Sequence, residues 1–346
     1  MQTEVTPEAQ AAIETVKDRI AAFLEAVMRC TAADSAPEVI AAVLNSAGDA
    51  FTETRTYTSE QLPPDRHGDG LGYEAAAVPH HPHLLVVVAR LAIECGEDGM
   101  LVLFTRRSGV WEPLTIRRSA PYEKVSGAYG WLRYAVSPPD SQGRWYLATA
   151  RVTPWCTSAW QGLDYDLSRP GDAPERPRIF FKRRVTTYLD NEDGGAVTAE
   201  ANRFVVRHDG SIADPDIVVR RHVEAYSVEG ETVRRIHPVA WNVRDFADEW
   251  IASSWDEAGD WSAAGLKGAH SLLRVLASDR GLEYRTIRRC APSVHEVAIS
   301  ADGHRPWYLL IRGEGPYRLE RASRGNLRKC SGPDATEGVK AAGNPW

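Results

Sequence analysis

Three copies of one short segment are the strongest constraint on the fold of this chain. Each has a threonine, a β-branched residue, two arginines and then a proline three residues after the second arginine, and the copies span residues 115–121, 232–238 and 286–292. β-Branched residues favour extended backbone, and proline, which has no N–H, ends the hydrogen-bonded ladder of a strand. The copies therefore predict strand ends, and with them a chain built mainly from antiparallel strands.

The copies leave two interpretations open. Their spacing is irregular, which excludes a solenoid or propeller of fixed period. They are either recurrent hairpin chemistry or the remains of an internal duplication. Successive strand residues face opposite sides, so only one arginine of each pair can line a given face. Six Arg-Arg pairs occur in the sequence, and most of their side chains are expected at the surface, paired with acidic residues.

Composition limits the class of protein. The 346 residues are long enough for about two domains. A hydrophobic content of 43% and a charged content of 25% are typical of a soluble globular protein. The net charge of −6 argues against a dedicated nucleic-acid or anionic-membrane binder. The apolar run at residues 84–89 has the length of a strand, so no membrane span is predicted.

The sequence decides neither the cellular compartment of the protein nor the disulfide state of its cysteines. Thr6 is the expected N-cap of an amphipathic helix, with Pro7 at its first position. No signal peptide is therefore predicted, and the chain is expected in the cytoplasm, or outside it if a leader has been removed. The five cysteines show no CxxC spacing, and their odd number leaves at least one thiol unpaired. The sequence does not decide the disulfide state of Cys95, Cys156, Cys290 and Cys330.

Hydrophobic spacing divides the chain into four parts. Residues 1–122 are predicted to form a helix pair and a three-strand meander, and residues 123–240 an antiparallel β region. The strands expected in the second region lie near residues 130–137, 144–153, 178–189, 203–208, 217–228 and 231–237. Residues 241–324 are predicted to form inserted helices and a C-terminal meander, followed by a loose tail over 325–346. The order of helix and then meander resembles curved-sheet folds of the cystatin or NTF2-like kind.

The fold class that follows is mainly β with some helix (α+β). We expect antiparallel meanders in curved sheets or a sandwich, an N-terminal helix pair, and one or two inserted helices. The first helix carries its apolar face on residues recurring at helical spacing, among them Val16, Ile20 and Phe23. Residues 59–82, rich in proline, glycine and histidine, are predicted to be a loop with at most one short strand.

An acidic, tryptophan-bearing segment after Asn242 is the first candidate site. Carboxylates beside indole rings are typical of sugar-processing sites, where rings stack on the sugar and paired acids exchange protons. The competing interpretation is an amphipathic helix: Asn242 is its N-cap, Asp245 satisfies free N–H groups of the first turn, and Phe246 and Trp250 dock into the core. Asp248 would then pair with Arg244 on the surface.

Two further segments are weaker candidates. Trp155 and Trp160 flank Cys156 and Ser158, but no GxSxG elbow is present, so an aromatic ligand platform is favoured over a nucleophile. The loop at residues 80–83 contains three histidines, but a zinc site there would need a further ligand from His67 or from a distant acid. No glycine-rich phosphate loop is present, and no metal or cofactor is predicted.

These observations favour a non-catalytic binding or scaffold protein with a tryptophan-lined concave surface for a small ligand of carbohydrate-like or aromatic character. The alternative is a hydrolase or lyase, glycosidase-like, that uses Asp245, Asp248 or Glu249 as acid and base. Catalysis is the less favoured of the two, and the oligomeric state is left open. The predicted ligand-binding residues are Trp155, Trp160, Trp241, Arg244, Asp245, Asp248 and Glu249.

Overall fold

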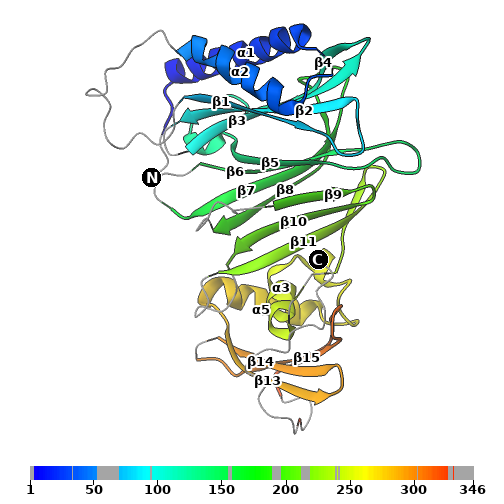
Figure 1. Ribbon diagram of the computed structural model, residues 1–346. Coiled ribbons are helices and arrows are strands. Elements are labelled where there is room, and N and C mark those ends of the chain that lie inside the picture. Colours follow the sequence, from blue (N-terminus) through cyan, green and yellow to red (C-terminus); the bar gives the residue numbers. More distant parts are fainter. Residues whose placement is uncertain are drawn as a thin grey trace. The chain divides into compact units, whose positions relative to one another are not determined.

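The computed structural model confirms a mainly β fold with an N-terminal helix pair (Figure 1). It describes residues 4–32, 34–52, 70–93, 96–154, 158–188, 196–211, 219–237, 240, 242–301, 303–325 and 330. Within them lie 16 strands in four antiparallel sheets of four strands, and five helices. No helix in these ranges has both the length and the apolar character needed to cross a membrane.

The chain divides into two compact units. The first comprises Met1–Phe204 and Val228–Thr232, and the second Val205–Ser227 and Val233–Trp346. The three boundaries predicted near residues 122, 240 and 324 stay predictions. Most of the predicted tail falls outside the described residues.

In the first unit, two helices cover one face of a sheet. The helices are α1 (Pro7–Cys30) and α2 (Pro37–Thr52). The sheet consists of β1 (Leu71–Ala77), β2 (Leu84–Ile93), β3 (Gly96–Arg107) and β4 (Val110–Arg117), in that order. Figure 1 shows both helices lying across the sheet. The shared core contains Leu24 and Met28 of α1, Ile40 of α2, and Val87 and Phe104 of the sheet.

The start of α1 follows the predicted chemistry. Thr6 is extended, its side chain accepts a hydrogen bond from the Ala9 N–H, and Pro7 occupies the first turn. The buried positions Ile20, Leu24 and Met28 recur every four residues. The helix therefore presents one apolar stripe to the sheet.

The opposite face of this sheet packs against a second sheet. That sheet contains β5 (Gly130–Val136), β6 (Leu147–Val152), β7 (Trp160–Arg169) and β8 (Arg178–Tyr188), in that order, and the short helix Val125–Gly127 precedes it. Leu101 and Leu103 of β3 meet Leu132 and Leu147 of β5 and β6. This half of the contact is apolar.

The other half of the contact is ionic. The Asp166 carboxylate of β7 is fully buried and accepts hydrogen bonds from Arg117 (2.5 Å), Arg151 (3.0 Å) and Thr149 (3.0 Å). Two guanidinium groups thus share one carboxylate out of contact with water. Such an arrangement holds only because each buried charge has a partner.

The strand β7 is absent from the strands predicted by sequence, although its central position gives it a neighbour on both sides. Its residues Gly162, Asp164 and Asp166 are types that strands disfavour. They occur here because both aspartates lie on the face that meets the buried arginines, where Arg151 approaches both carboxylates. The tertiary ion pairs override the local propensity. The short strand β9 (Ala196–Glu200) was likewise not predicted.

The third sheet has the order β12-β11-β10-β9. Its other strands are β10 (Arg203–Gly210), β11 (Arg220–Glu229) and β12 (Thr232–Arg235). On β11 the residues Arg220, His222 and Glu224 lie on one face because strand side chains alternate. This face carries most of the charge discussed below.

The second unit contains the remaining helices and the fourth sheet. The helices are α3 (Val243–Ala252), α4 (Trp255–Ala258) and α5 (Lys267–Arg280). The sheet consists of β13 (Glu283–Ala291), β14 (Val294–Ser300), β15 (Trp307–Arg312) and β16 (Arg318–Ser323), in that order. Phe246, Trp250 and Trp261 pack with Leu273 and Val297 in its core. A disulfide joins Cys290 to Cys330.

All three copies of the repeated segment lie at strand ends, as predicted. They fall at the last residues of β4, β12 and β13. One arginine of a pair faces inward in two of them: Arg117 is 5% exposed, and the Arg235 side chain is 3% exposed. The expectation that these arginines are mostly at the surface is therefore incomplete, because the inward-facing member can be buried against carboxylates.

Candidate functional site

The tryptophans predicted to line a binding surface are only partly accounted for. Trp155 and Trp241 lie outside the described residues. Trp160 begins β7, is partly buried, and packs edge-on against Tyr188 with ring centroids 5.0 Å apart. Trp250 and Trp261 are sealed in the core of the second unit, at 0% and 1% exposure.

The acidic segment forms the predicted amphipathic helix, α3. The Asn242 side chain accepts a hydrogen bond from the Asp245 N–H at 2.9 Å, so Asn242 is the N-cap of α3 and Asp245 lies in its first turn. Phe246 and Trp250 are fully buried, as predicted. The Arg244 guanidinium lies over the Tyr284 ring, 4.9 Å from its centroid.

The two carboxylates on the other side of α3 are not solvated. Asp248 is 1% exposed and Glu249 is 9% exposed. Arg220 of β11 bonds both, with its Nη2 atom 2.8 Å from Asp248 Oδ2 and 3.0 Å from Glu249 Oε2. Helix α3 therefore has an apolar side in the core and an ionic side on the third sheet, both inside the second unit.

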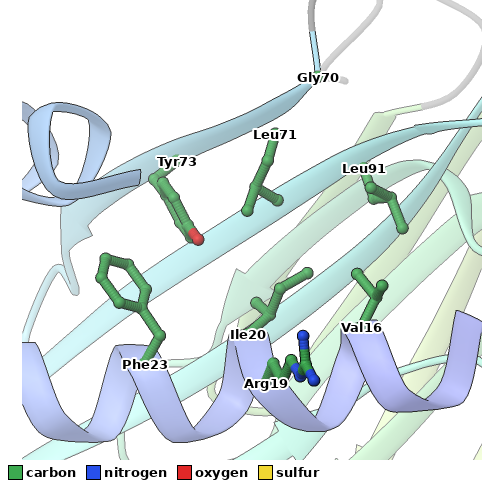
Figure 2. Close-up of a pocket in the computed structure, with 8 residues that line it drawn as sticks. All are labelled: Val16, Arg19, Ile20, Phe23, Gly70, Leu71, Tyr73 and Leu91. Carbon is green, nitrogen blue, oxygen red and sulfur yellow. The ribbon is translucent and has the colours of Figure 1, made fainter. Parts of the chain in front are cut away.

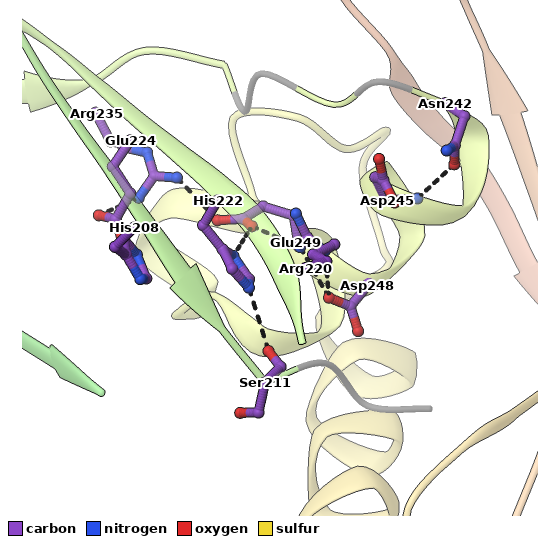
Figure 3. A network of polar contacts seen from close by, with 10 residues as sticks. All are labelled: His208, Ser211, Arg220, His222, Glu224, Arg235, Asn242, Asp245, Asp248 and Glu249. Atoms are coloured by element: carbon purple, nitrogen blue, oxygen red, sulfur yellow. Dashed lines mark hydrogen bonds and ion pairs between the residues drawn. The ribbon is translucent and has the colours of Figure 1, made fainter. Parts of the chain in front are cut away.

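Glu249 lies at the centre of a larger buried network (Figure 3). Its Oε1 atom accepts a hydrogen bond from Arg235 at 2.8 Å, and His222 Nδ1 lies 3.1 Å from its Oε2 atom. Arg235 also bonds Glu224 at 2.7 Å. One helix and two strands are thus joined by charge-assisted hydrogen bonds, which are stronger than bonds between neutral groups.

Two stacked histidine rings complete the network. The rings of His208 and His222 are nearly parallel, with centroids 5.1 Å apart. Gly210 leaves room for them, because a Cβ atom there would lie 2.9 Å from the His222 ring. The nitrogens of His222 face two acceptors, Glu249 Oε2 and the Ser211 carbonyl oxygen at 3.2 Å.

The charges in this network indicate a structural role for Glu249. Burial would by itself raise the pKa of Glu249, but the His222 hydrogen bond and the charges of Arg235 and Arg220 hold that pKa well below its usual value. A general acid needs a raised pKa and access to substrate. Glu249 has the opposite shift, and its oxygens are already occupied by donors.

The predicted histidine loop also has a local structural explanation. His81 is 3% exposed and its Nε2 atom lies 2.8 Å from the Ser137 carbonyl oxygen. Its ring packs against Trp145, with centroids 5.5 Å apart. Among the described residues, no three His, Cys, Asp or Glu side chains are grouped to hold a metal ion.

A hollow of about 250 Å³ lies in the first unit, between α1 and the ends of β1 and β2 (Figure 2). Leu71 and Leu91 are directly paired across the two strands, and they point toward α1 on the core face of the sheet. Both remain partly exposed. The described residues that line it are Val16, Arg19, Ile20, Phe23, Gly70, Leu71, Tyr73 and Leu91.

The walls are apolar and two groups are polar. Phe23 and Tyr73 close one side, with ring centroids 5.5 Å apart. The Tyr73 ring extends from β1 with its hydroxyl end toward α1. Burial raises the pKa of Tyr73 to about 12, so the phenol stays protonated at neutral pH. Arg19 is exposed on the α1 side of the hollow and makes no hydrogen bond or ion pair with another described residue.

Part of the lining of this hollow could be predicted from the sequence. Val16, Ile20 and Phe23 were recognised as the apolar face of the first helix. Leu71 and Tyr73 were not, because they lie within residues 59–82, which were predicted to be a loop with at most one short strand; β1 is that strand. The alternation of Leu71, Tyr73 and Ala75 is the signal that identifies the strand.

Comparison of the sequence with known protein families and with curated proteins finds no match.

Proposed function

We propose that this protein is a non-catalytic binding protein, and that the hollow under α1 is where it takes a small ligand. The observation that carries the proposal is the combination of apolar walls with two polar groups in one concave space. Ligand sites in proteins are mostly apolar hollows with a few polar groups that orient the ligand. The hollow has this composition and lies on a helix and two strands, which hold its walls in place.

The size of the hollow limits the ligand. Its volume is about 250 Å³, whereas an engineered cavity of ~150 Å³ in another protein binds benzene. A single substituted ring or a short aliphatic chain therefore fits within the hollow. Sites for drug-sized ligands begin at about 300 Å³. The ligand is accordingly a compact one.

The burial and ion pairing of the candidate catalytic carboxylates favour a binding protein over a hydrolase. The proposed acid and base, Asp248 and Glu249, are both bonded to Arg220 and are nearly inaccessible. Asp245 lies at the N-terminal turn of α3. A glycosidase would need two of these groups facing one open pocket, about 5–10 Å apart. The tryptophan-lined surface around Trp155, Trp160 and Trp241 stays a separate prediction.

A thermal-shift screen with small aromatic and aliphatic compounds tests the proposal. A ligand at 100 times its Kd stabilises the native state by about 2.7 kcal/mol. The diagnostic variant is Val16→Trp, because Val16 lines the hollow and is 38% exposed, so a larger side chain can enter the hollow without displacing the core. The matched control is Val39→Trp on α2, where the valine is 54% exposed and outside the lining.

The expected result is that some compounds stabilise the unmodified protein and the Val39→Trp variant but not the Val16→Trp variant. Two results would overturn the proposal. One is a screen in which no compound stabilises the protein. The other is stabilisation that survives Val16→Trp unchanged, which would place the ligand elsewhere.

A further inference from the structure

Among the described residues, one cation on α1 beside the hollow has no ionic partner. The acids on this stretch of the helix already have partners: Glu14 pairs with Lys17, and Asp18 pairs with Arg118 at 2.5 Å. Lys17 is buried and also donates to Ser119. Arg19 directly follows Asp18 in the sequence and makes no hydrogen bond or ion pair with another described residue. Arg19 is the cation among the described residues that line the hollow, and it can pair with an incoming anion.

A guanidinium group in this position favours a negatively charged ligand over a neutral or positively charged one. Its planar fork donates two parallel hydrogen bonds and matches the two oxygens of a carboxylate. A cationic ligand would meet repulsion from Arg19 instead. Since the walls beside Arg19 are apolar, the same ligand must carry a hydrocarbon body to fill the hollow.

The second polar group is compatible with an anion. The Tyr73 hydroxyl is neutral because burial raises its pKa to about 12. It can therefore donate a hydrogen bond without adding a negative charge. The hollow thus offers a cation on the helix, a neutral donor from the strand, and aliphatic and aromatic walls between them.

Building on the proposed function, we infer that the ligand of this hollow is a small amphipathic carboxylate: one compact apolar chain or ring carrying a single carboxylate that pairs with Arg19. Medium-chain fatty acids and aryl-alkanoic acids have this chemistry. Their chain lies against Ile20, Phe23 and Leu91, and the carboxylate lies toward the Arg19 side of the hollow.

Isothermal titration with three probes of equal chain length separates charge from hydrophobicity. The probes are octanoate, octanol and octylammonium. Octanoate is expected to bind most tightly and octylammonium least. An exposed ion pair contributes up to about 1 kcal/mol, so octanoate should bind about three- to fivefold more tightly than octanol. This advantage should shrink at high salt, because salt screens exposed charges, while octanol binding changes little.

The variant Arg19→Gln removes the cation and leaves a shorter, uncharged polar side chain. It is expected to weaken octanoate to the level of octanol and to leave octanol unchanged. The matched control is Arg29→Gln, which removes another exposed arginine from the same helix, one that pairs with Glu25. That control should preserve the preference for octanoate.

The outcomes distinguish the inference from the proposed function. If octanol and octanoate bind equally, Val16→Trp abolishes both and Arg19→Gln changes neither, the hollow is a binding site and the carboxylate inference is wrong. Preferred binding of octylammonium overturns the inference in the same way. If none of the three probes binds, and the wider screen is also negative, the proposed function fails as well.

Discussion

Replacing Glu249 by glutamine removes the charge that holds the buried network of the second unit together. The carboxylate accepts hydrogen bonds from Arg220 at 3.0 Å and from Arg235 at 2.8 Å, and faces His222 Nδ1 at 3.1 Å. Glutamine has nearly the same shape but keeps one acceptor oxygen and places an NH₂ group against donors. Breaking a buried ion pair by removing one partner costs about 3–5 kcal/mol.

That cost is large compared with the stability of a typical protein, about 5–15 kcal/mol. With a urea dependence of roughly 2 kcal/mol per molar, Glu249→Gln should lower the unfolding midpoint by roughly 2 M. Urea unfolding measures the midpoint, and hydrogen exchange of peptides from α3 and β11 assigns the loss to the second unit. The matched control is Glu283→Gln: this carboxylate is 46% exposed and pairs with Arg285, so the change should cost under about 1 kcal/mol.

The same group makes a pH prediction whose sign follows from its lowered pKa. A carboxylate with a folded-state pKa below its unfolded value stabilises the fold at every pH above the unfolded pKa, here 4.5. This contribution is lost as the pH falls from there through the folded pKa. The stability difference between the unmodified protein and Glu249→Gln should thus be constant from pH 7 to about pH 5 and shrink in more acidic buffer. A Glu249→Gln variant that is no less stable than Glu283→Gln would contradict a stabilising role for the buried network around Glu249.

Two further substitutions have defined outcomes. Asp166→Asn leaves two buried arginines of the first unit without their shared carboxylate, and should lower the free energy of unfolding by about 3–5 kcal/mol; a urea titration showing a loss below about 1 kcal/mol would contradict this. Gly210→Ala places a Cβ atom 2.9 Å from the His222 ring and should cost about 1–3 kcal/mol through overpacking. Gly268→Ala, which meets nothing within 4 Å in α5, should be neutral or stabilising in the same assay.

The elements that follow local rules could be predicted from the sequence. The repeated Thr-β-branched-Arg-Arg segments mark the ends of β4, β12 and β13 because threonine, β-branched residues and proline act on the backbone directly. The N-caps Thr6 and Asn242 were recognised for the same reason. These features depend on residues close in sequence, so no knowledge of the tertiary fold was needed.

The elements that depend on distant partners could not be predicted. The strand β7 contains Asp164 and Asp166, which disfavour a strand until arginines from β4 and β6 neutralise them. In the same way, Glu249 was recognised as a candidate, but its partners Arg220 and Arg235 precede it on separate strands. A single sequence contains no signal for pairs that far apart.

The hollow falls between these two cases. Its α1 wall could be predicted from the helical spacing of Val16, Ile20 and Phe23. Its sheet wall could not, because the Leu71–Leu91 pair arises from the register of β1 on β2. Arg19 is an ordinary helix-surface residue in the sequence, and its position beside an apolar hollow is visible only in three dimensions.

Methyl NMR of protein labelled at isoleucine, leucine and valine tests the central claim most directly, because it locates the ligand. On addition of octanoate, the account predicts shifts of the methyl groups of Val16, Ile20, Leu71 and Leu91. It predicts none for Leu273, which lies in the core of the second unit. Shifts confined to methyl groups of the second unit would contradict the account. So would the absence of any shift both with saturating octanoate and with each of the other compounds in the screen.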